Sequence, residues 1–141
     1  MTYGYLSAGI TATTVLVVGA IFLLLLLPLS DEFVKAGSAT TQHSETIGIN
    51  LKNGGAFSYQ IGMALWGLGG ILFCSLLYKS KLVPRLLAVW GFIGYIVFIA
   101  GTVLELFGNN IGVVLSIPGG LFEISLSIWL IVKGFYFSKE V

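Results

Sequence analysis

Residues 111–132 carry the sequence IGVVLSIPGGLFEISLSIWLIV, and this stretch decides the fold predicted for the chain. At a rise of about 1.5 Å per residue, a helix of this length crosses the roughly 30 Å of hydrocarbon in a bilayer. Its only ionisable residue is Glu123, which lies close to its midpoint. A carboxyl at that depth costs roughly 3 kcal/mol on insertion scales, so such groups usually face other protein. Glu123 is therefore expected on an inward, packed face, as a candidate functional residue.

The composition indicates that lipid surrounds the whole chain. Hydrophobic residues make up 57% of it and charged residues 9%, whereas a soluble domain carries about 25% charged residues. The net charge of +1 gives no basic footprint for a nucleic acid. The single cysteine, Cys74, cannot form an internal disulfide or a cysteine metal site, and we expect it to be a small buried apolar side chain. No metal site or cofactor is predicted.

Three further apolar stretches are long enough to cross a bilayer, namely residues 8–29, 57–78 and 86–107. Together with residues 111–132 they predict an all-α fold. The chain is expected to be a single transmembrane domain, an integral membrane four-helix bundle with antiparallel, up-and-down helices. A short turn at residues 108–110 makes the last two spans an antiparallel hairpin.

Residues 30–56 are the only long polar segment, and we expect them to lie outside the membrane. Ser30, followed by two acidic residues, is typical of a helix N-terminus, and Gly37 would end that short helix. The run Asn53-Gly54-Gly55 predicts a turn just before the second span.

Small residues inside the spans predict close helix packing, because they let helix backbones approach one another in a membrane. The positions chosen on helical spacing are Gly67, Gly70, Gly91, Gly94, Gly101, Gly112 and Ser116. In the first span Ser7, Thr11 and Thr14 share one face. Their hydroxyls could bond to a neighbouring helix or to carbonyls of their own helix, and both alternatives stay open.

Two more features surround Glu123 in this prediction. Pro118-Gly119-Gly120 is expected to interrupt the fourth helix one turn away, since proline removes a backbone donor. Glu105 lies near the end of the third span, where a capping or snorkelling role competes with a functional one. Pro118, Gly119 and Glu105 are therefore candidate intramembrane residues beside Glu123.

Basic residues predict the orientation of the chain in the membrane. They gather at one side, at Lys79, Lys81, Arg85, Lys133 and Lys139, while Lys35 and Lys52 are on the other. The richer side is expected to be cytoplasmic. Both termini would then be cytoplasmic and residues 30–56 would lie outside the cell membrane.

Several short strings resemble a bacterial multi-pass membrane family called domain of unknown function 4386 (DUF4386). They are LLLPLS at 25–30, FVKAG at 33–37, QIGM at 60–63, LLYKS at 76–80, LVPRL at 82–86, VWGFIG at 89–94, LFEI at 121–124 and WLIVKGF at 129–135. The resemblance implies a polytopic protein of the bacterial inner membrane with no established activity. It also implies a truncated form, or the later part of a larger bundle, because members usually have further spans before this point. Members tend to carry an arginine and a glutamate around residues 9–12, where this chain has neither.

An enzyme is not expected. Glu105 and Glu123 are separated by about 10–15 Å along the membrane normal, which is too far for most carboxylate pairs of hydrolases. The only histidine, His43, and the only aspartate, Asp31, are both in the polar segment, so no Ser-His-Asp set is possible.

Two functions are weighed instead. In the first, the protein is a structural or interaction module that packs with a second copy or with other membrane spans. A protonated Glu123 then donates a hydrogen bond to a neighbouring helix, with Tyr95 as the expected partner. In the second, a proton- or solute-transport subunit uses Glu123 beside the broken helix. A cavity that reaches Glu123 favours transport and a sealed contact favours packing; a sensor of lipophilic ligands is a third reading.

Overall fold

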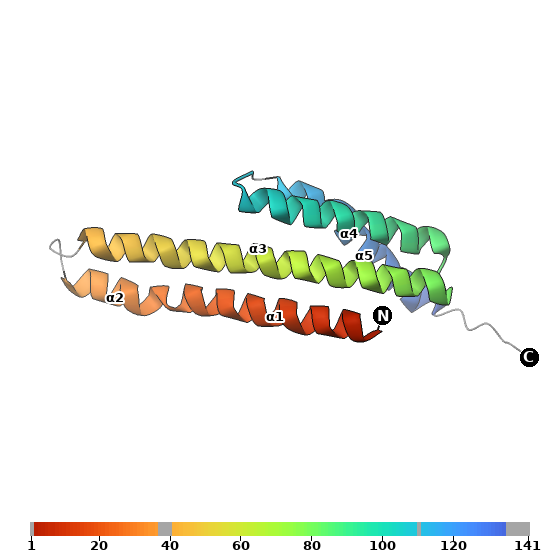
Figure 1. Cartoon of the computed structure of the whole chain (residues 1–141), viewed down its shortest axis with the longest axis horizontal. Helices are drawn as coiled ribbons and strands as arrows, with labels where there is room; N and C mark the ends of the chain where they lie inside the picture. The colour runs from red at the N-terminus through yellow and green to blue at the C-terminus, as the bar shows by residue number, and fades with distance from the viewer. Residues whose placement is uncertain (1, 37–40, 110, 135–141) are drawn as a thin grey trace, which may run out of the picture.

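The computed structural model of this chain describes residues 2–36, 41–109 and 111–134. Within them it has five α-helices and no strand: α1 (Thr2–Leu24), α2 (Leu26–Ala36), α3 (Thr41–Ser80), α4 (Arg85–Leu106) and α5 (Gly112–Lys133). Four stretches are long and apolar enough to cross a membrane: Thr2–Lys35, His43–Ser80, Arg85–Leu106 and Gly112–Lys133. Successive stretches run in opposite directions (Figure 1), which confirms the predicted all-α, up-and-down membrane fold.

The first two helices form one rod with a single irregularity at Leu25. Pro28 explains it, because a proline has no N–H for the carbonyl four residues earlier, here that of Leu24. The Leu25 N–H still bonds to the Ile21 oxygen at 3.0 Å, so the chain continues in nearly the same direction.

The segment at residues 30–56 differs from its prediction. Ser30 lies inside α2 instead of capping a helix, and α3 runs through Asn53 without a turn, so both predictions are wrong. The glycines that suggested a turn serve packing instead. A Cβ on Gly55 would lie 3.1 Å from Leu23 Cδ2, so the missing side chain lets α1 approach α3 closely. Gly37 lies outside the described residues.

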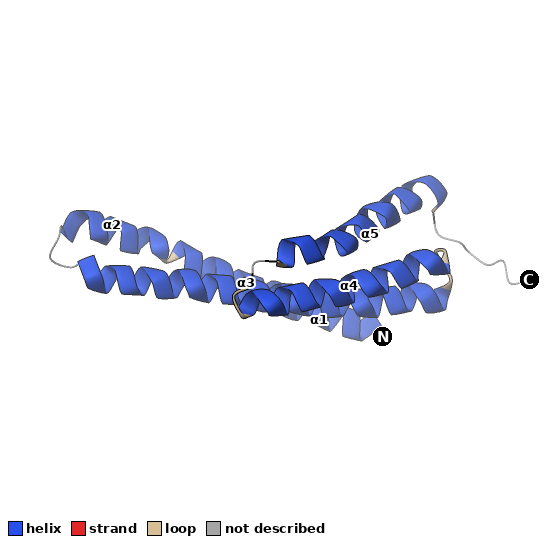
Figure 2. Ribbon diagram, turned by 90° about the horizontal axis from the view of Figure 1, so that it is seen from above, coloured by secondary structure: helices blue, strands red, loops and turns tan. Residues whose placement is uncertain are grey.

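The α1–α3 pair is longer than the α4–α5 hairpin. Near the end of α4, Glu105 is bonded to Gln60 of α3. Nineteen residues of α3 precede Gln60, which corresponds to about 28 Å of helix. This part of α3, paired with α2, projects past the α4–α5 connection (Figures 1 and 2).

The helices form an open row. Close backbone neighbours are α1 with α3, α3 with α4, and α4 with α5, while α2 lies against α3 and the end of α1. No Cα atom of α5 comes within 8 Å of α1 or α3 among the described residues. Figure 2 shows α5 set to one side of the other helices. One flank of α5 is therefore left without a helical neighbour.

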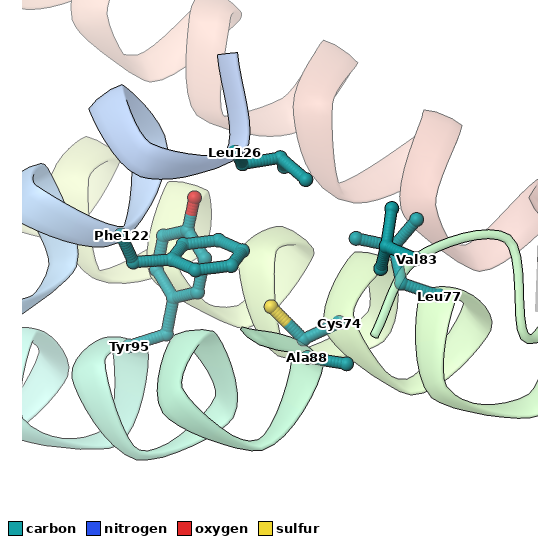
Figure 3. Packing of buried hydrophobic residues seen from close by; sticks show 7 residues of the cluster. All are labelled: Cys74, Leu77, Val83, Ala88, Tyr95, Phe122 and Leu126. Atoms are coloured by element: carbon teal, nitrogen blue, oxygen red, sulfur yellow. The ribbon is translucent and has the colours of Figure 1, made fainter. Parts of the chain in front are cut away.

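The buried core lies among α3, α4 and α5, toward the end of the molecule that carries the α3–α4 turn. It consists of Cys74, Leu77, Val83, Ala88, Tyr95, Phe122 and Leu126 (Figure 3). Phe122 is fully buried, and Cys74 is the small buried side chain that its apolar surroundings predicted. Only one face of α5 contributes side chains to this core. The core therefore fixes how α5 is rotated about its own axis.

Candidate functional site

A hydrogen bond between α4 and α5 forms the centre of the site. The Tyr95 hydroxyl donates to Glu123 Oε1 at 2.7 Å, so the expected partners meet. The Tyr95 ring is buried and stands edge-on to Phe122, with ring centroids 6.0 Å apart. Figure 3 shows the two rings together, with the tyrosine hydroxyl directed toward α5.

Two glycines make room for these rings. A Cβ on Gly70 of α3 would collide with the Tyr95 ring, and a Cβ on Gly91 of α4 would lie 2.5 Å from Phe122 Cζ and 2.7 Å from Cys74 Sγ. Tyr95 can therefore cross the surface of α3 and reach Glu123 only because position 70 has no side chain. The small residues predicted to pack helices also shape the site.

The acid itself is more open than the sequence indicated. Glu123 is exposed although its Oε1 is bonded to Tyr95, so the acid is less enclosed than predicted. The face of α5 that meets α4 carries Gly112, Gly119, Phe122 and Leu126. Glu123 follows Phe122 and is turned about 100° from it, toward the open flank.

Two cavities adjoin Glu123. One of about 300 Å³ lies where α5 faces α1 and α3, and its lining includes Tyr5, Phe73 and Ser127. The other, of about 200 Å³, lies along the same flank and includes Ser116 and Gly120. Both share the same three residues, Trp66, Tyr95 and Glu123. Among the described residues that line them, none is lysine, arginine or histidine, so the carboxyl has no cationic neighbour there.

The fourth span is not broken. α5 is helical without interruption through Pro118, Gly119 and Gly120, so the predicted break is wrong. Proline removes only one hydrogen bond, that to the Val114 carbonyl, and the helix on either side continues. The helices also cross tightly here, since a Cβ on Gly94 would be 3.1 Å from the Gly119 Cα.

Glu105 belongs to a second, separate contact. It is half-buried, accepts a hydrogen bond from Gln60 Nε2 of α3, and lies directly against Gly112 of α5. It therefore links three helices, instead of capping a helix or snorkelling to water. An amide in an apolar span is a known signal for such bonds.

The other predicted packing positions lie at helix crossings with one exception. A Cβ on Gly67 would be 2.6 Å from Ile99 Cγ1, and one on Gly101 would be 2.8 Å from Leu115 Cβ. Ser116 lines the smaller cavity and donates to its own helix at Val113 O. Ser7, Thr11 and Thr14 likewise donate to carbonyls of their own helix, which settles the alternative left open by the sequence.

Sequence reasoning missed the aromatic wall of the site. Trp66 is 46% exposed and borders both cavities, and Phe73, two turns further along α3, stacks near Tyr5 of α1 with ring centroids 5.6 Å apart. The sequence feature that could have revealed this wall is the spacing of Trp66, Gly70 and Phe73, which places all three on one face of α3.

A family model described as "Domain of unknown function (DUF4386)" matches residues 1–134. The chain belongs to this family. The DUF4386 resemblance predicted from the sequence is thus confirmed over nearly the whole chain. Neither the curated proteins nor the solved structures compared with it include a match. Gly9, in the stretch where the resemblance implies charged residues in other DUF4386 members, lines the larger cavity together with Glu123.

Proposed function

We propose that this DUF4386 protein is a membrane transport subunit that takes up a solute or a proton at Glu123. The observation that carries the proposal is that two cavities reach the carboxyl from the open flank of α5. A contact made only for packing would be sealed, whereas Glu123 keeps an accessible side chain. The proposal assigns the protein no catalytic step.

The surroundings of Glu123 suit reversible binding. The Tyr95 hydroxyl fixes one carboxyl oxygen, and the other lining groups are mostly apolar or aromatic. A carboxylate in such apolar surroundings is unfavourable in free energy. Binding of a proton or cation therefore lowers the free energy, and its release raises it again. Tyr95 is held by Phe122 and Gly70, which keeps the carboxyl in place while its partner is exchanged.

The test is a flux measurement on the whole chain in liposomes, with a pH-sensitive dye inside and a proton gradient as the driving force. We expect flux above that of protein-free liposomes, lost in Glu123→Gln. Glu105→Gln is the matched control, because it neutralises the other carboxyl of α4 and α5, outside both cavities. Equal flux in native and Glu123→Gln protein, or none in either, would overturn the proposal.

A second candidate function is an interaction module that packs with another copy of this chain. The open flank of α5 favours it, because Ser116, Gly120 and Ser127 are small and would let a helix approach. With Cys74→Ala in the background, Gly120→Cys should then form a disulfide dimer in the membrane. Ile93→Cys, exposed on α4, is the control and should stay monomeric. Dimers at both positions, or at neither, would count against this reading.

We infer that the protein lies in the bacterial inner membrane with both termini in the cytoplasm. The support is the gathering of Lys79, Lys81, Arg85 and Lys133 at one end of the helices, while Lys35 lies at the other (Figure 1). Labelling of single cysteines by a membrane-impermeant maleimide in intact cells tests this. Lys35→Cys should react and Lys133→Cys should not, and the reverse result would invert the orientation.

A further inference from the structure

We propose that the solute taken up at Glu123 is a hydrophobic organic cation, of the quaternary ammonium or phosphonium class, that enters sideways from the lipid. This inference rests on the proposed function and names the ligand class of the same site. It follows from the charge, the aromatic lining and the position of the larger cavity.

The charge of the site selects a cation. Glu123 is the one ionisable carboxyl among the described residues that line the two cavities, and none of those residues is basic. Tyr95 supplies one hydrogen bond to Oε1, and no cationic side chain adjoins the carboxyl among the described lining residues. In surroundings of low polarity, an anionic solute would be repelled and a cationic one attracted.

The walls select a cation with an apolar surface. Tyr5, Trp66, Phe73 and Tyr95 all line the larger cavity around Glu123. The face of an aromatic ring attracts a cation within about 6 Å of its centre, and tryptophan and tyrosine do so most strongly. Quaternary ammonium groups are recognised by cages of this composition.

The same lining disfavours a polar solute such as a sugar. The serine hydroxyls at the cavities already donate to their own helix, Ser127 to Glu123 O and Ser116 to Val113 O. Few hydrogen-bonding groups remain for a solute with many hydroxyls, and an unmatched polar group in an apolar cavity is costly.

Access is from the side of the bundle. The backbone of α5 does not come close to that of α1 or α3. Trp66 and Tyr5 are each more than one-third exposed. The larger cavity, about 300 Å³, has the volume of a small-molecule site, and the smaller one adjoins the same three residues. A hydrophobic cation concentrates in lipid and can reach this flank without crossing water.

The test uses two probes of nearly equal shape and opposite charge, tetraphenylphosphonium and tetraphenylborate, with the full chain in nanodiscs. Saturable binding above that of empty nanodiscs is measured by equilibrium dialysis. We expect saturable binding of tetraphenylphosphonium only. Glu123→Gln should weaken it by more than about tenfold, whereas Glu105→Gln should leave it unchanged.

A second pair of variants tests the aromatic wall, even if Glu123→Gln proves hard to produce. Trp66 is partly exposed, so its replacement leaves the core intact. Trp66→Ala should weaken binding about 3- to 30-fold, and Trp66→Phe should stay within about threefold of the native protein. Circular dichroism and gel filtration check that each variant is folded.

Three outcomes would overturn the inference: equal saturable binding of both probes, no saturable binding of tetraphenylphosphonium, or equal affinity in native and Glu123→Gln protein. Its failure can be told apart from that of the proposed function. Proton flux that depends on Glu123 without tetraphenylphosphonium binding would remove the ligand class and keep transport. Tetraphenylphosphonium binding that depends on Glu123, without any flux, would keep the ligand class and remove transport.

Discussion

Gly70 of α3 lies directly beneath the aromatic ring of Tyr95 of α4, so closely that no Cβ fits between them. The ring passes over this gap to bring its hydroxyl within 2.7 Å of Glu123 on a third helix, α5. One absent side chain thus determines whether three helices meet at the carboxyl.

Gly70→Ala should therefore displace the Tyr95 ring and destabilise the protein by about 1–3 kcal/mol, the usual cost of overpacking. Reversible unfolding in mixed micelles measures the free energy of unfolding. Gly120→Ala is the control, because a Cβ on Gly120 meets no atom within 4 Å, and we expect no loss and a gain of up to about 1 kcal/mol from helix propensity. Similar losses at both positions would mean that contact with the Tyr95 ring is not the cause, because helix propensity alone favours alanine over glycine.

The bond between Tyr95 and Glu123 should make a modest contribution to stability. Tyr95→Phe keeps the ring against Phe122 and removes only the hydroxyl, so we expect a loss of about 0.6–1.7 kcal/mol. A double-mutant cycle with Glu123→Ala isolates the pairwise energy, whereas a glutamine at position 123 would still accept the hydrogen bond. If the two single losses simply add, the hydrogen bond contributes nothing beyond the separate side chains.

The absence of a turn at residues 53–55 can be tested by proline. Asn53 is exposed within α3, so Asn53→Pro removes a helical hydrogen bond to the Ile49 carbonyl and should cost about 3 kcal/mol. Asn53→Ala keeps the donor and should be neutral or slightly stabilising. A turn would accept the proline, so equal thermal stability of the two variants would show that α3 begins later than Thr41.

Space beside Gly9 allows a cation to be built into the larger cavity. A Cβ on Gly9 meets no atom within 4 Å, and the residue shares that cavity with Glu123. Gly9→Lys should stabilise the protein by roughly 1 kcal/mol and abolish tetraphenylphosphonium binding by occupying the site with its own charge. Gly9→Met is the neutral control of similar length. Both side chains gain helix propensity over glycine, so the charge contributes only the difference by which Gly9→Lys is the more stable. This difference should vanish when Glu123→Gln is present.

The number of membrane helices followed from the sequence because apolar length determines it, and their up-and-down order followed because successive spans alternate in direction. The pairing of Tyr95 with Glu123 was also expected, from their similar depth in the bundle. Several local features were not predicted correctly. Gly54-Gly55 has the composition of a turn, and only the presence of α1 against it, with Leu23 filling the space, shows that it is a packing surface.

Pro118 and Glu123 illustrate two other limits. A proline marks a lost hydrogen bond, but the rest of α5 and its crossing with α4 at Gly119 keep the helix continuous. Helical periodicity gives relative angles around α5, yet it does not say how many neighbours the helix has. Because α4 is the one described helix whose backbone lies close to that of α5, a turn of one residue from Phe122 to Glu123 moves from the core to the open flank.

The unequal hairpins have a consequence for the bilayer around the protein. α4 and α5 each contain 22 residues, or about 33 Å of helix, which is close to the thickness of the hydrocarbon layer. The Thr2–Lys35 rod, with 34 residues, measures about 51 Å and exceeds it. Hydrophobic mismatch therefore acts on the α4–α5 hairpin. The longer α1–α3 pair accommodates a thicker or thinner membrane by shifting along its helix axis relative to the bilayer. A change of lipid chain length would shear α3 against α4, which is the interface that holds Tyr95 over Gly70.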